Sequence, residues 1–210
     1  MAKNVYGATK EAAEDLCWLV AKENPEMDVV VLRTSRFFPE GDDAEVLELE
    51  DDENLKVLEL AYRRVDVADV VGACVCAMRR RENRGGEGGA AVVKSGGGGN
   101  WGRYVISAPT IFKREEDLEE LGGGNAQEVF ARRVEGCREI FERKGWAWLK
   151  RLDRVYDSSR AVEELGWKPE YTFERAVEKV RAGEEWRSEL TLRVGKLGYH
   201  AVSTGVYTTR

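Results

Sequence analysis

The chain has 210 residues, and its 39 acidic and 33 basic side chains give a net charge of −6. Proteins that hold nucleic acid through phosphate contacts carry a basic surface, so nucleic acid is not an expected partner. No apolar run approaches the roughly 20 residues that cross a bilayer, and the first residues lack the apolar stretch of a secretion signal. These features predict a cytoplasmic protein without a membrane partner.

Cysteine and histidine are scarce, which limits the expected metal and disulfide chemistry. The four cysteines form no C-x-x-C pair, and Cys74 and Cys76 lie in an apolar run where small buried thiols are ordinary. The single histidine, His200, is too little for a zinc site or a Ser-His-Asp triad. We therefore expect reduced structural cysteines and no metal.

The N-terminal region predicts one α/β unit. Apolar residues recur at three- and four-residue spacing over 7–23, which indicates a helix that Pro25 stops. The continuous apolar run 28–33 follows, typical of a strand that is buried on both faces. Residues 39–54 are acidic and broken, which favours a loop with at most one helical turn.

The rest of the chain alternates short strand and helix patterns around a glycine-rich stretch. A strand is expected at 64–67, and Asp66 or Asp69 is expected to cap a helix over 68–81. Residues 83–102 are so rich in glycine that we expect a flexible surface insertion. A strand near 103–108 and helices over the following ranges complete the prediction: 115–121, 125–144, 158–165 and 173–182, with helix C-caps at Gly145 and Gly166.

The sharpest chemical signal is Y-x-x-x-K, formed by Tyr6 and Lys10 at the start of the first helix. Residues four apart lie one turn apart on the same face, within reach of one ligand. A phenol is too weak an acid to act as a base at neutral pH, but a nearby cation favours the phenolate. This pair suits redox chemistry at a carbon that bears oxygen. The spacing also fits a packed tyrosine beside a solvated lysine.

The surrounding residues resemble a known enzyme family. Tyr6-Gly7-Ala8-Thr9-Lys10, followed by a helix and a buried strand, is similar to the Y-G-x-[ST]-K segment of extended short-chain dehydrogenases/reductases, the NAD-dependent epimerase/dehydratase family. Val65-Asp66-Val67-Ala68-Asp69-Val70-Val71 looks like its V-H-V-x-D-V-V element. Asp157-Ser158-Ser159-Arg160-Ala161, with Glu164-Leu165-Gly166-Trp167-Lys168-Pro169, looks like its D-x-S-K-A…E-L-G-W-x-P motif. The resemblance spans about residues 4–182.

The resemblance implies a nicotinamide cofactor, NAD or NADP, and a small-molecule substrate, with a nucleotide-sugar among the candidates. Tyr6 would move the proton of a substrate hydroxyl, while Lys10 would hold the nicotinamide ribose and favour the phenolate. Thr34 and Ser35, directly after the first strand, would line the cofactor together with Tyr6 and Lys10. Arg36 could bind an anionic group of the substrate, although a solvated loop arginine is the favoured interpretation.

Two departures from the family pattern limit this expectation. A dinucleotide needs a glycine-rich turn that opens a helix, and in the family this turn precedes Y-x-x-x-K. The string Gly97-x-Gly99-x-x-Gly102 leads toward a strand instead, so it fails that requirement. Asp66 stands where the family usually has histidine, which leaves the substrate open.

The expected fold is α/β: a partial Rossmann-like doubly wound sheet with a mostly helical substrate-binding lobe. Residues 1–38 would be the C-terminal remnant of the NAD(P)-binding domain, and residues 39–210 the substrate-binding lobe. The resemblance thus predicts an N-terminally truncated epimerase/dehydratase-like oxidoreductase. The alternative is a non-catalytic remnant that acts as a binding or dimerisation module. A homodimer through the first helix, with Leu16, Trp18 and Leu19, fits either interpretation.

Overall fold

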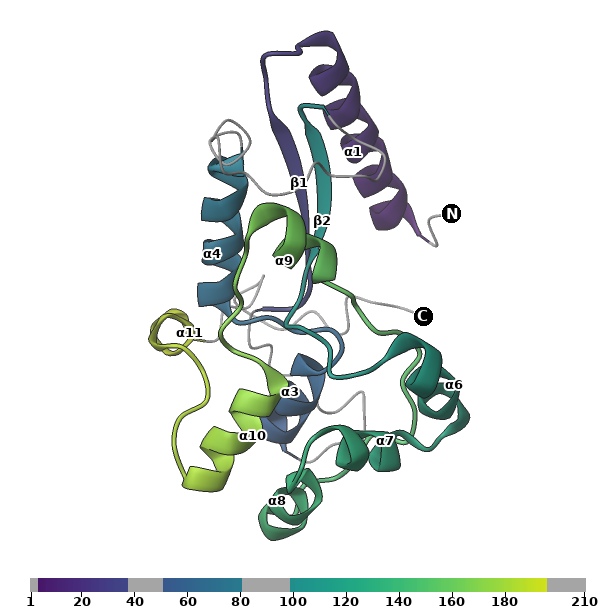
Figure 1. Cartoon of the computed structure of the whole chain (residues 1–210), viewed down its shortest axis with the longest axis vertical. Coiled ribbons are helices and arrows are strands. Elements are labelled where there is room, and N and C mark those ends of the chain that lie inside the picture. Colours follow the sequence, from purple (N-terminus) through teal and green to yellow (C-terminus); the bar gives the residue numbers. More distant parts are fainter. Residues whose placement is uncertain (1–3, 38–50, 81–98, 196–210) are drawn as a thin grey trace.

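The computed structural model describes residues 4–37, 51–80 and 99–195 (Figure 1). Within these ranges the chain forms nine helices and a two-stranded parallel sheet, so the fold is mixed α/β and mostly helical. The elements in chain order are α1 (Val5–Glu23), β1 (Val29–Thr34), α3 (Asp52–Leu60), α4 (Val67–Met78), β2 (Trp101–Ile106), α6 (Arg114–Gly123), α7 (Ala126–Arg133), α8 (Cys137–Lys144), α9 (Ser159–Leu165), α10 (Phe173–Ala182) and α11 (Glu189–Val194).

The first helix and strand form as predicted, apart from their ends. Asn4 begins α1 by accepting a hydrogen bond from the backbone N–H of Gly7 at 2.8 Å, which supplies one of the partners that a helix N-terminus lacks. The helix therefore starts two residues before the predicted Gly7 and ends at Glu23, ahead of Pro25. Ala21 is the one described residue of α1 that is buried.

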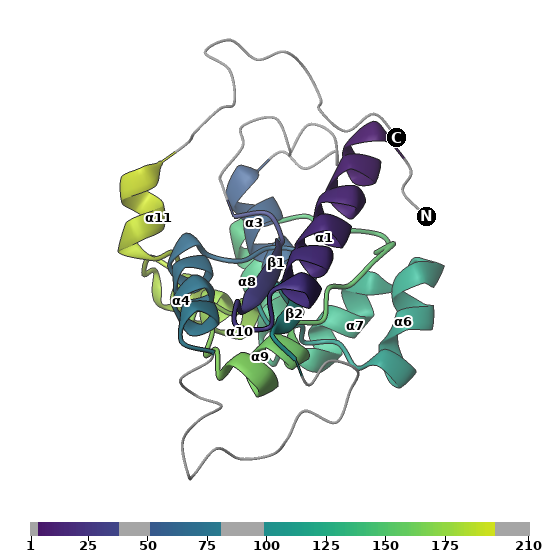
Figure 2. The same cartoon turned by 90° about the horizontal axis from the view of Figure 1, so that it is seen from above.

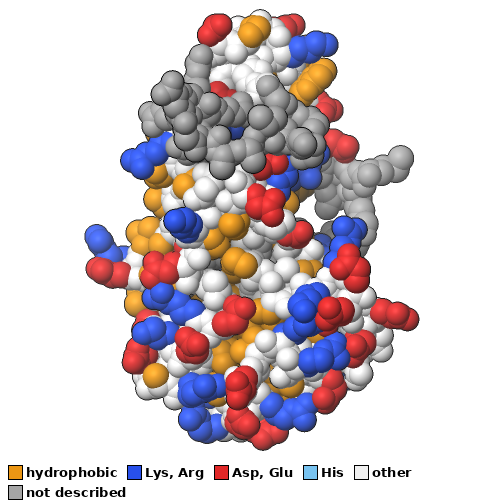
Figure 3. All heavy atoms as spheres, in the orientation of Figure 1, with side chains coloured by type: hydrophobic (Ala, Val, Ile, Leu, Met, Phe, Trp, Pro, Cys, Tyr) orange, Lys and Arg blue, Asp and Glu red, His pale blue; other side chains and the backbone are white. Residues whose placement is uncertain are grey.

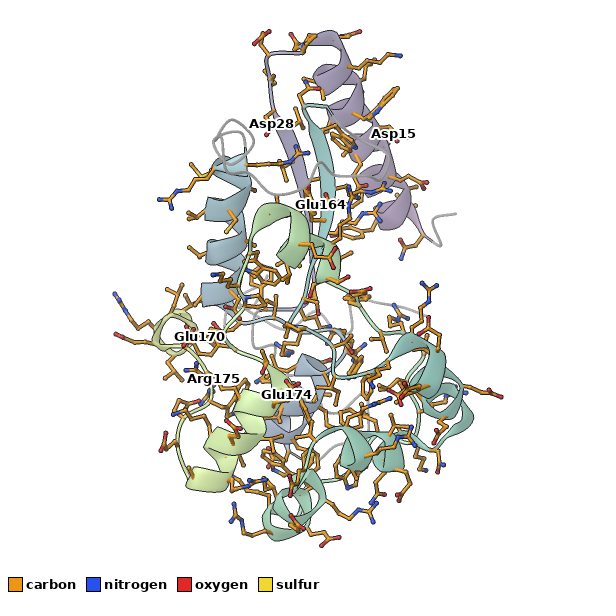
Figure 4. All side chains as sticks on the ribbon, viewed as in Figure 1. Asp15, Asp28, Glu164, Glu170, Glu174 and Arg175 are labelled. Atoms are coloured by element: carbon orange, nitrogen blue, oxygen red, sulfur yellow. The ribbon has the colours of Figure 1, made fainter. Side chains whose placement is uncertain are left out.

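The sheet joins two distant segments. β1 pairs with β2 in parallel, in a register that runs from Val29 opposite Trp101 to Thr34 opposite Ile106. Helix α1 covers one face of this sheet, and α4 and α9 cover the other (Figures 1 and 2). Two polar contacts connect the sheet region to its neighbours, and Figure 4 labels one residue of each. Asp28, just before β1, forms an ion pair with Arg80 at 2.8 Å, and Glu164 of α9 accepts a hydrogen bond from the Tyr104 hydroxyl at 3.0 Å.

The expectation that β1 is buried on both faces is wrong. Its first four residues are half-buried, and Arg33 and Thr34 are exposed. Val30 and Leu32 pack toward α4 and α9, whereas the outer edge of β1 has no neighbouring strand within the described ranges. A continuous apolar run is typical of a central parallel strand. Here it lies at the edge of a sheet of two.

The strand expected at 64–67 reduces to a single bridge between Arg36 and Arg64. The reason is that Asp66 caps α4, accepting a hydrogen bond from the Ala68 backbone N–H at 2.8 Å, so the chain turns into a helix at Val67. Of the two predicted caps, Asp66 is therefore confirmed.

The prediction for 39–54, a loop with one helical turn, missed the extent of the helix, because α3 begins at Asp52 and continues to Leu60. Asp51 accepts hydrogen bonds from Glu53 and Asn54 and begins α3, while 38–50 lie outside the described residues. Acidic residues at a helix N-terminus are favoured by its dipole, so the negative charge that suggested a solvated loop serves a helix start. Helix α3 is central to the larger core, with Leu55, Val57 and Leu58 fully buried.

Around α3 pack α6, α7, α8 and α10, and a cluster of aromatic rings fills the space between them. The helix predicted over 125–144 is broken, because Gly136 adopts φ +71° and separates α7 from α8. The predicted C-caps at Gly145 and Gly166 are confirmed, both with φ +66°. Trp146 lies buried, and Trp148 stacks on Phe141 with ring centroids 4.0 Å apart.

The four cysteines are free, as predicted, but Cys74 is exposed rather than buried. Ala73 is buried and marks the inward face of α4. Because successive residues of a helix are rotated by about 100°, Cys74 points away from that face. The described residues contain no helix that is long and apolar enough to span a membrane, and no cluster of metal-binding side chains.

Low pH should weaken the attachment of α6 to α7, because Asp117 of α6 is fully buried and binds two arginines of α7. Burial raises its pKa, but hydrogen bonds from Arg133, the Lys113 backbone and Arg132 outweigh this and hold the pKa at about 2. The stabilisation is therefore complete above about pH 4 and is lost as the pH falls toward 2.

We expect Asp117→Asn to lower the free energy of unfolding at pH 7 by about 2 kcal/mol, because the ion pairs with both arginines are lost. Urea unfolding between pH 7 and pH 2 measures the difference, which should shrink as the pH falls. The exposed Glu119→Gln is the control. A difference that stays constant down to pH 2 would contradict this assignment.

Candidate functional site

Helix α1 presents the predicted pair side by side. The Lys10 ammonium nitrogen lies 5.4 Å from the centre of the Tyr6 ring, as expected for residues one helical turn apart. The side chain of Tyr6 is 70% exposed, and Lys10 is exposed as well. Both groups are therefore accessible to a ligand, and neither is enclosed in a core.

An ion pair fixes α1 on the sheet close to this pair. Glu14, one turn beyond Lys10, accepts two hydrogen bonds from Arg33 at 2.7 Å and one from Arg103 at 3.2 Å. The hydrogen bonds from Arg33 hold the pKa of Glu14 below its usual range. Because α1 and β1 run in opposite directions, the helix end that carries Tyr6 and the strand end that carries Thr34 lie at the same end of the unit (Figure 1).

The three other predicted residues follow at the end of β1. Thr34 is exposed and closes the strand. Ser35 is 6% exposed; its backbone N–H donates to Ile106, but its buried hydroxyl has no hydrogen-bond partner within the described ranges. A buried hydroxyl without a partner is costly, so it is a place where a bound polar group would stabilise the protein.

Arg36 belongs to a group of charges around Glu59. Glu59 is fully buried and accepts hydrogen bonds from Arg63 and Arg64 at 2.8 Å each. A guanidinium nitrogen of Arg36 lies 3.7 Å from the same carboxylate. Arg36, Arg63 and Arg64 thus converge on one buried carboxylate at the strand ends. The predicted contact of Arg36 with an anionic substrate remains a prediction.

The described residues do not offer a dinucleotide cradle. The glycine string that ends at Gly102 is predicted to lead into a strand and not a helix. Gly102 does lie in β2, and Gly97 lies outside the described residues. A Cβ at Gly102 would lie 2.7 Å from the Tyr104 ring and 3.0 Å from the Arg80 guanidinium, so close packing explains this glycine. A glycine-rich turn that opens a helix, as a pyrophosphate site requires, is not part of the described structure.

The motifs near the C-terminus have structural roles. Trp167 is 1% exposed and donates from its indole nitrogen to the Asp69 backbone at 3.0 Å. The Asp69 carboxylate accepts the backbone N–H groups of Glu170 and Tyr171 at 2.9 Å each. These contacts attach the segment around Pro169 to α4.

Asp66, like Asp69, lies at the N-terminal end of α4. Its carboxylate caps the helix and accepts hydrogen bonds from Ser188 and Thr191, which begin α11. All of its described contacts therefore join elements of the fold.

Sequence reasoning missed a pocket of about 720 Å³ between α6 and the segment 151–159. Its walls come from residues between Thr110 and Gly122 and between Arg151 and Ser159, and none of the five predicted site residues lines it. Charged side chains of both signs are interspersed over the lower part of the molecule (Figure 3). In the sequence, the segment Lys150-Arg151-Leu152-Asp153-Arg154 stands out by its four charged residues. It does not by itself predict a pocket, because the other wall comes from α6, about 30 residues earlier in the chain.

In comparisons with known proteins, no family model matches the chain, and no curated protein or solved structure matches it significantly.

The exposure of Tyr6 gives a direct test of its placement. Tetranitromethane should nitrate Tyr6 well before Tyr62 and Tyr104, which are 3% and 1% exposed. Mass spectrometry of tryptic peptides measures the order, and the chain unfolded in guanidinium chloride, where all three should react, is the control. Earlier nitration of Tyr62 or Tyr104 would mean that α1 does not present Tyr6 to solvent.

Proposed function

We propose that this chain carries the Tyr/Lys pair and the substrate-binding lobe of an epimerase/dehydratase-like oxidoreductase that uses NAD or NADP. The substrate would be a nucleotide-sugar or a small hydroxy or keto compound. The observation that carries the proposal is the exposed Tyr6 with the Lys10 ammonium 5.4 Å from its ring. The unpaired hydroxyl of Ser35 at the same end of the α/β unit supports it.

The chemistry divides between the coenzyme and these side chains. A bound nicotinamide coenzyme would supply hydride transfer to or from the carbon that bears the substrate oxygen. Tyr6 takes the proton of the substrate hydroxyl as the carbonyl forms, and returns it in the reverse direction. Lys10 would hold the ribose of the coenzyme by hydrogen bonds, and its charge would stabilise the tyrosinate.

The dinucleotide-binding half must come from elsewhere, and two open surfaces support this. The sheet order leaves the outer edge of β1 without a strand within the described ranges, and alternate residues there direct backbone N–H and C=O groups outward. Helix α1 buries only Ala21 among its described residues, while Leu16 is 63% exposed. Further parallel strands and helices would cover both surfaces.

The 210-residue chain alone should bind NADH and NADPH no more tightly than about 1 mM, because the described part lacks a helix N-terminus that holds the pyrophosphate. Quenching of tryptophan fluorescence during titration measures the affinity. Saturable binding at micromolar concentration would show that the chain contains a complete coenzyme site.

The roles of Tyr6 and Lys10 require the chain fused behind a glycine-rich nucleotide-binding half. We expect Tyr6→Phe to abolish turnover of the fused protein with a panel of UDP- and dTDP-sugars and small hydroxy acids, and to leave NADH affinity within about twofold, because the phenol acts on the proton. Lys10→Met should weaken NADH by about tenfold, since it removes a charged hydrogen bond.

Lys22→Met is the matched control, because Lys22 lies on the same helix at its other end, over Trp18. It should leave NADH affinity unchanged. Full turnover by the Tyr6→Phe protein would remove this residue from the mechanism.

A second function is favoured by the apolar side chains on α1. Leu16, Leu19 and Val20 are 63%, 42% and 41% exposed and recur at helical spacing. They form an apolar stripe whose exposure to water is unfavourable. Such a stripe fits a homodimer in which two copies of α1 pack together. The chain would then be a non-catalytic dimerisation module.

For this second function we expect the double variant Leu16→Glu, Leu19→Glu to shift the sedimenting species from dimer to monomer, because two charges would be buried at the contact. Analytical ultracentrifugation at matched concentrations measures the mass. Leu192→Glu, on the 45% exposed Leu192 of α11, is the control and should leave the mass unchanged. A monomer before any substitution would exclude this module.

A further inference from the structure

The pocket between α6 and the segment 151–159 is independent of the Tyr/Lys pair. Its volume of about 720 Å³ falls within the roughly 300–1,000 Å³ of small-molecule sites. It is built on one wall from α6 and the turn before it, and on the other from the chain that leads into α9. Its ligand therefore need not be a substrate of the proposed oxidoreductase.

The floor of the pocket is apolar. Phe112, Leu121 and Leu152 are 7%, 1% and 6% exposed and reach the pocket from both walls. Leu118 lies beside them and is 42% exposed, although the other residues of its helix turn are charged. A ligand with an apolar body would cover Leu118 and contact the buried side chains beneath it.

The rim of the pocket has two arginines with no ion pair within the described ranges. Arg154 is occupied, because its guanidinium binds the Asp153 carboxylate at 2.6 Å. Arg114 at the start of α6 and Arg151 on the facing wall have no such partner, in a chain with more acidic than basic residues. Guanidinium groups pair preferentially with carboxylates and phosphates.

The charge of the lining indicates the charge of the ligand. Among the described residues, three arginines and two aspartates line the pocket, which gives this part of the lining one net positive charge. Asp157, the second aspartate, accepts the backbone N–H of Ser159 at 2.9 Å and stays at the rim. A single negative charge balances this lining, whereas a dianionic phosphate would meet two carboxylates.

We propose that this pocket binds a small monocarboxylate with an apolar body. Its carboxylate accepts hydrogen bonds from Arg114 and Arg151, and its apolar part lies on Phe112, Leu118 and Leu121. Neither arginine is buried, so both remain free to adjust to the ligand.

The test uses 2-naphthoate and the full 210-residue chain, with calorimetry for the affinity and amide chemical shifts for the location. We expect saturable binding with shifts confined to 110–122 and 151–159. Arg114→Gln and Arg151→Gln should each weaken 2-naphthoate by about tenfold, since each removes a charged hydrogen bond. Lys150→Gln is the matched control, because Lys150 adjoins Arg151 in the chain but does not line the pocket.

Two further ligands separate the parts of the proposal. Neutral 2-naphthylmethanol should bind at least tenfold more weakly than 2-naphthoate, and inorganic phosphate should not displace 2-naphthoate at equal concentration. Equal affinity for the alcohol, unchanged affinity of both arginine variants, or shifts located on α1 would overturn the proposal. Displacement by phosphate would overturn it as well, because phosphate has no apolar body. Circular dichroism of each variant establishes that the fold is retained.

Discussion

The parallel pairing of β1 with β2 positions every candidate group in the upper part of the molecule. Val29 pairs with Trp101, although more than a third of the chain separates them in sequence. This pairing builds the sheet face on which α1 packs. Glu14 then binds one arginine from each strand, Arg33 and Arg103, so the helix is held by the pair of strands rather than by either alone. The accessibility of Tyr6 and Lys10 depends on this arrangement.

Buried charge is the second constraint on the fold. Glu59 gathers three arginines at the end of the sheet, and Asp117 binds Arg132 and Arg133 between α6 and α7. A buried carboxylate is tolerated only when its partners are present, so each cluster specifies which elements meet.

The exposed apolar surface and the arginine-rimmed pocket suggest two different kinds of partner. A helix that buries one of its nineteen residues suits a protein partner, and so does a strand whose outer edge has no neighbouring strand in the described ranges, because a second backbone could pair with that edge. A concave site with an apolar floor and two uncommitted guanidiniums calls for a small anion. These surfaces are independent, and each can be tested while the other is unoccupied.

The sequence by itself determined the local features: the helix at the start, the Asp66 cap, the glycine stops at Gly145 and Gly166, and the one-turn spacing of Tyr6 and Lys10. These depend on neighbours within a few residues, where propensity and capping act. It could not reveal the buried α3 behind its acidic start, the half-exposed β1, or the pocket with Arg114 and Arg151. Those depend on contacts between segments far apart in the chain, and only the tertiary structure decides which segments meet.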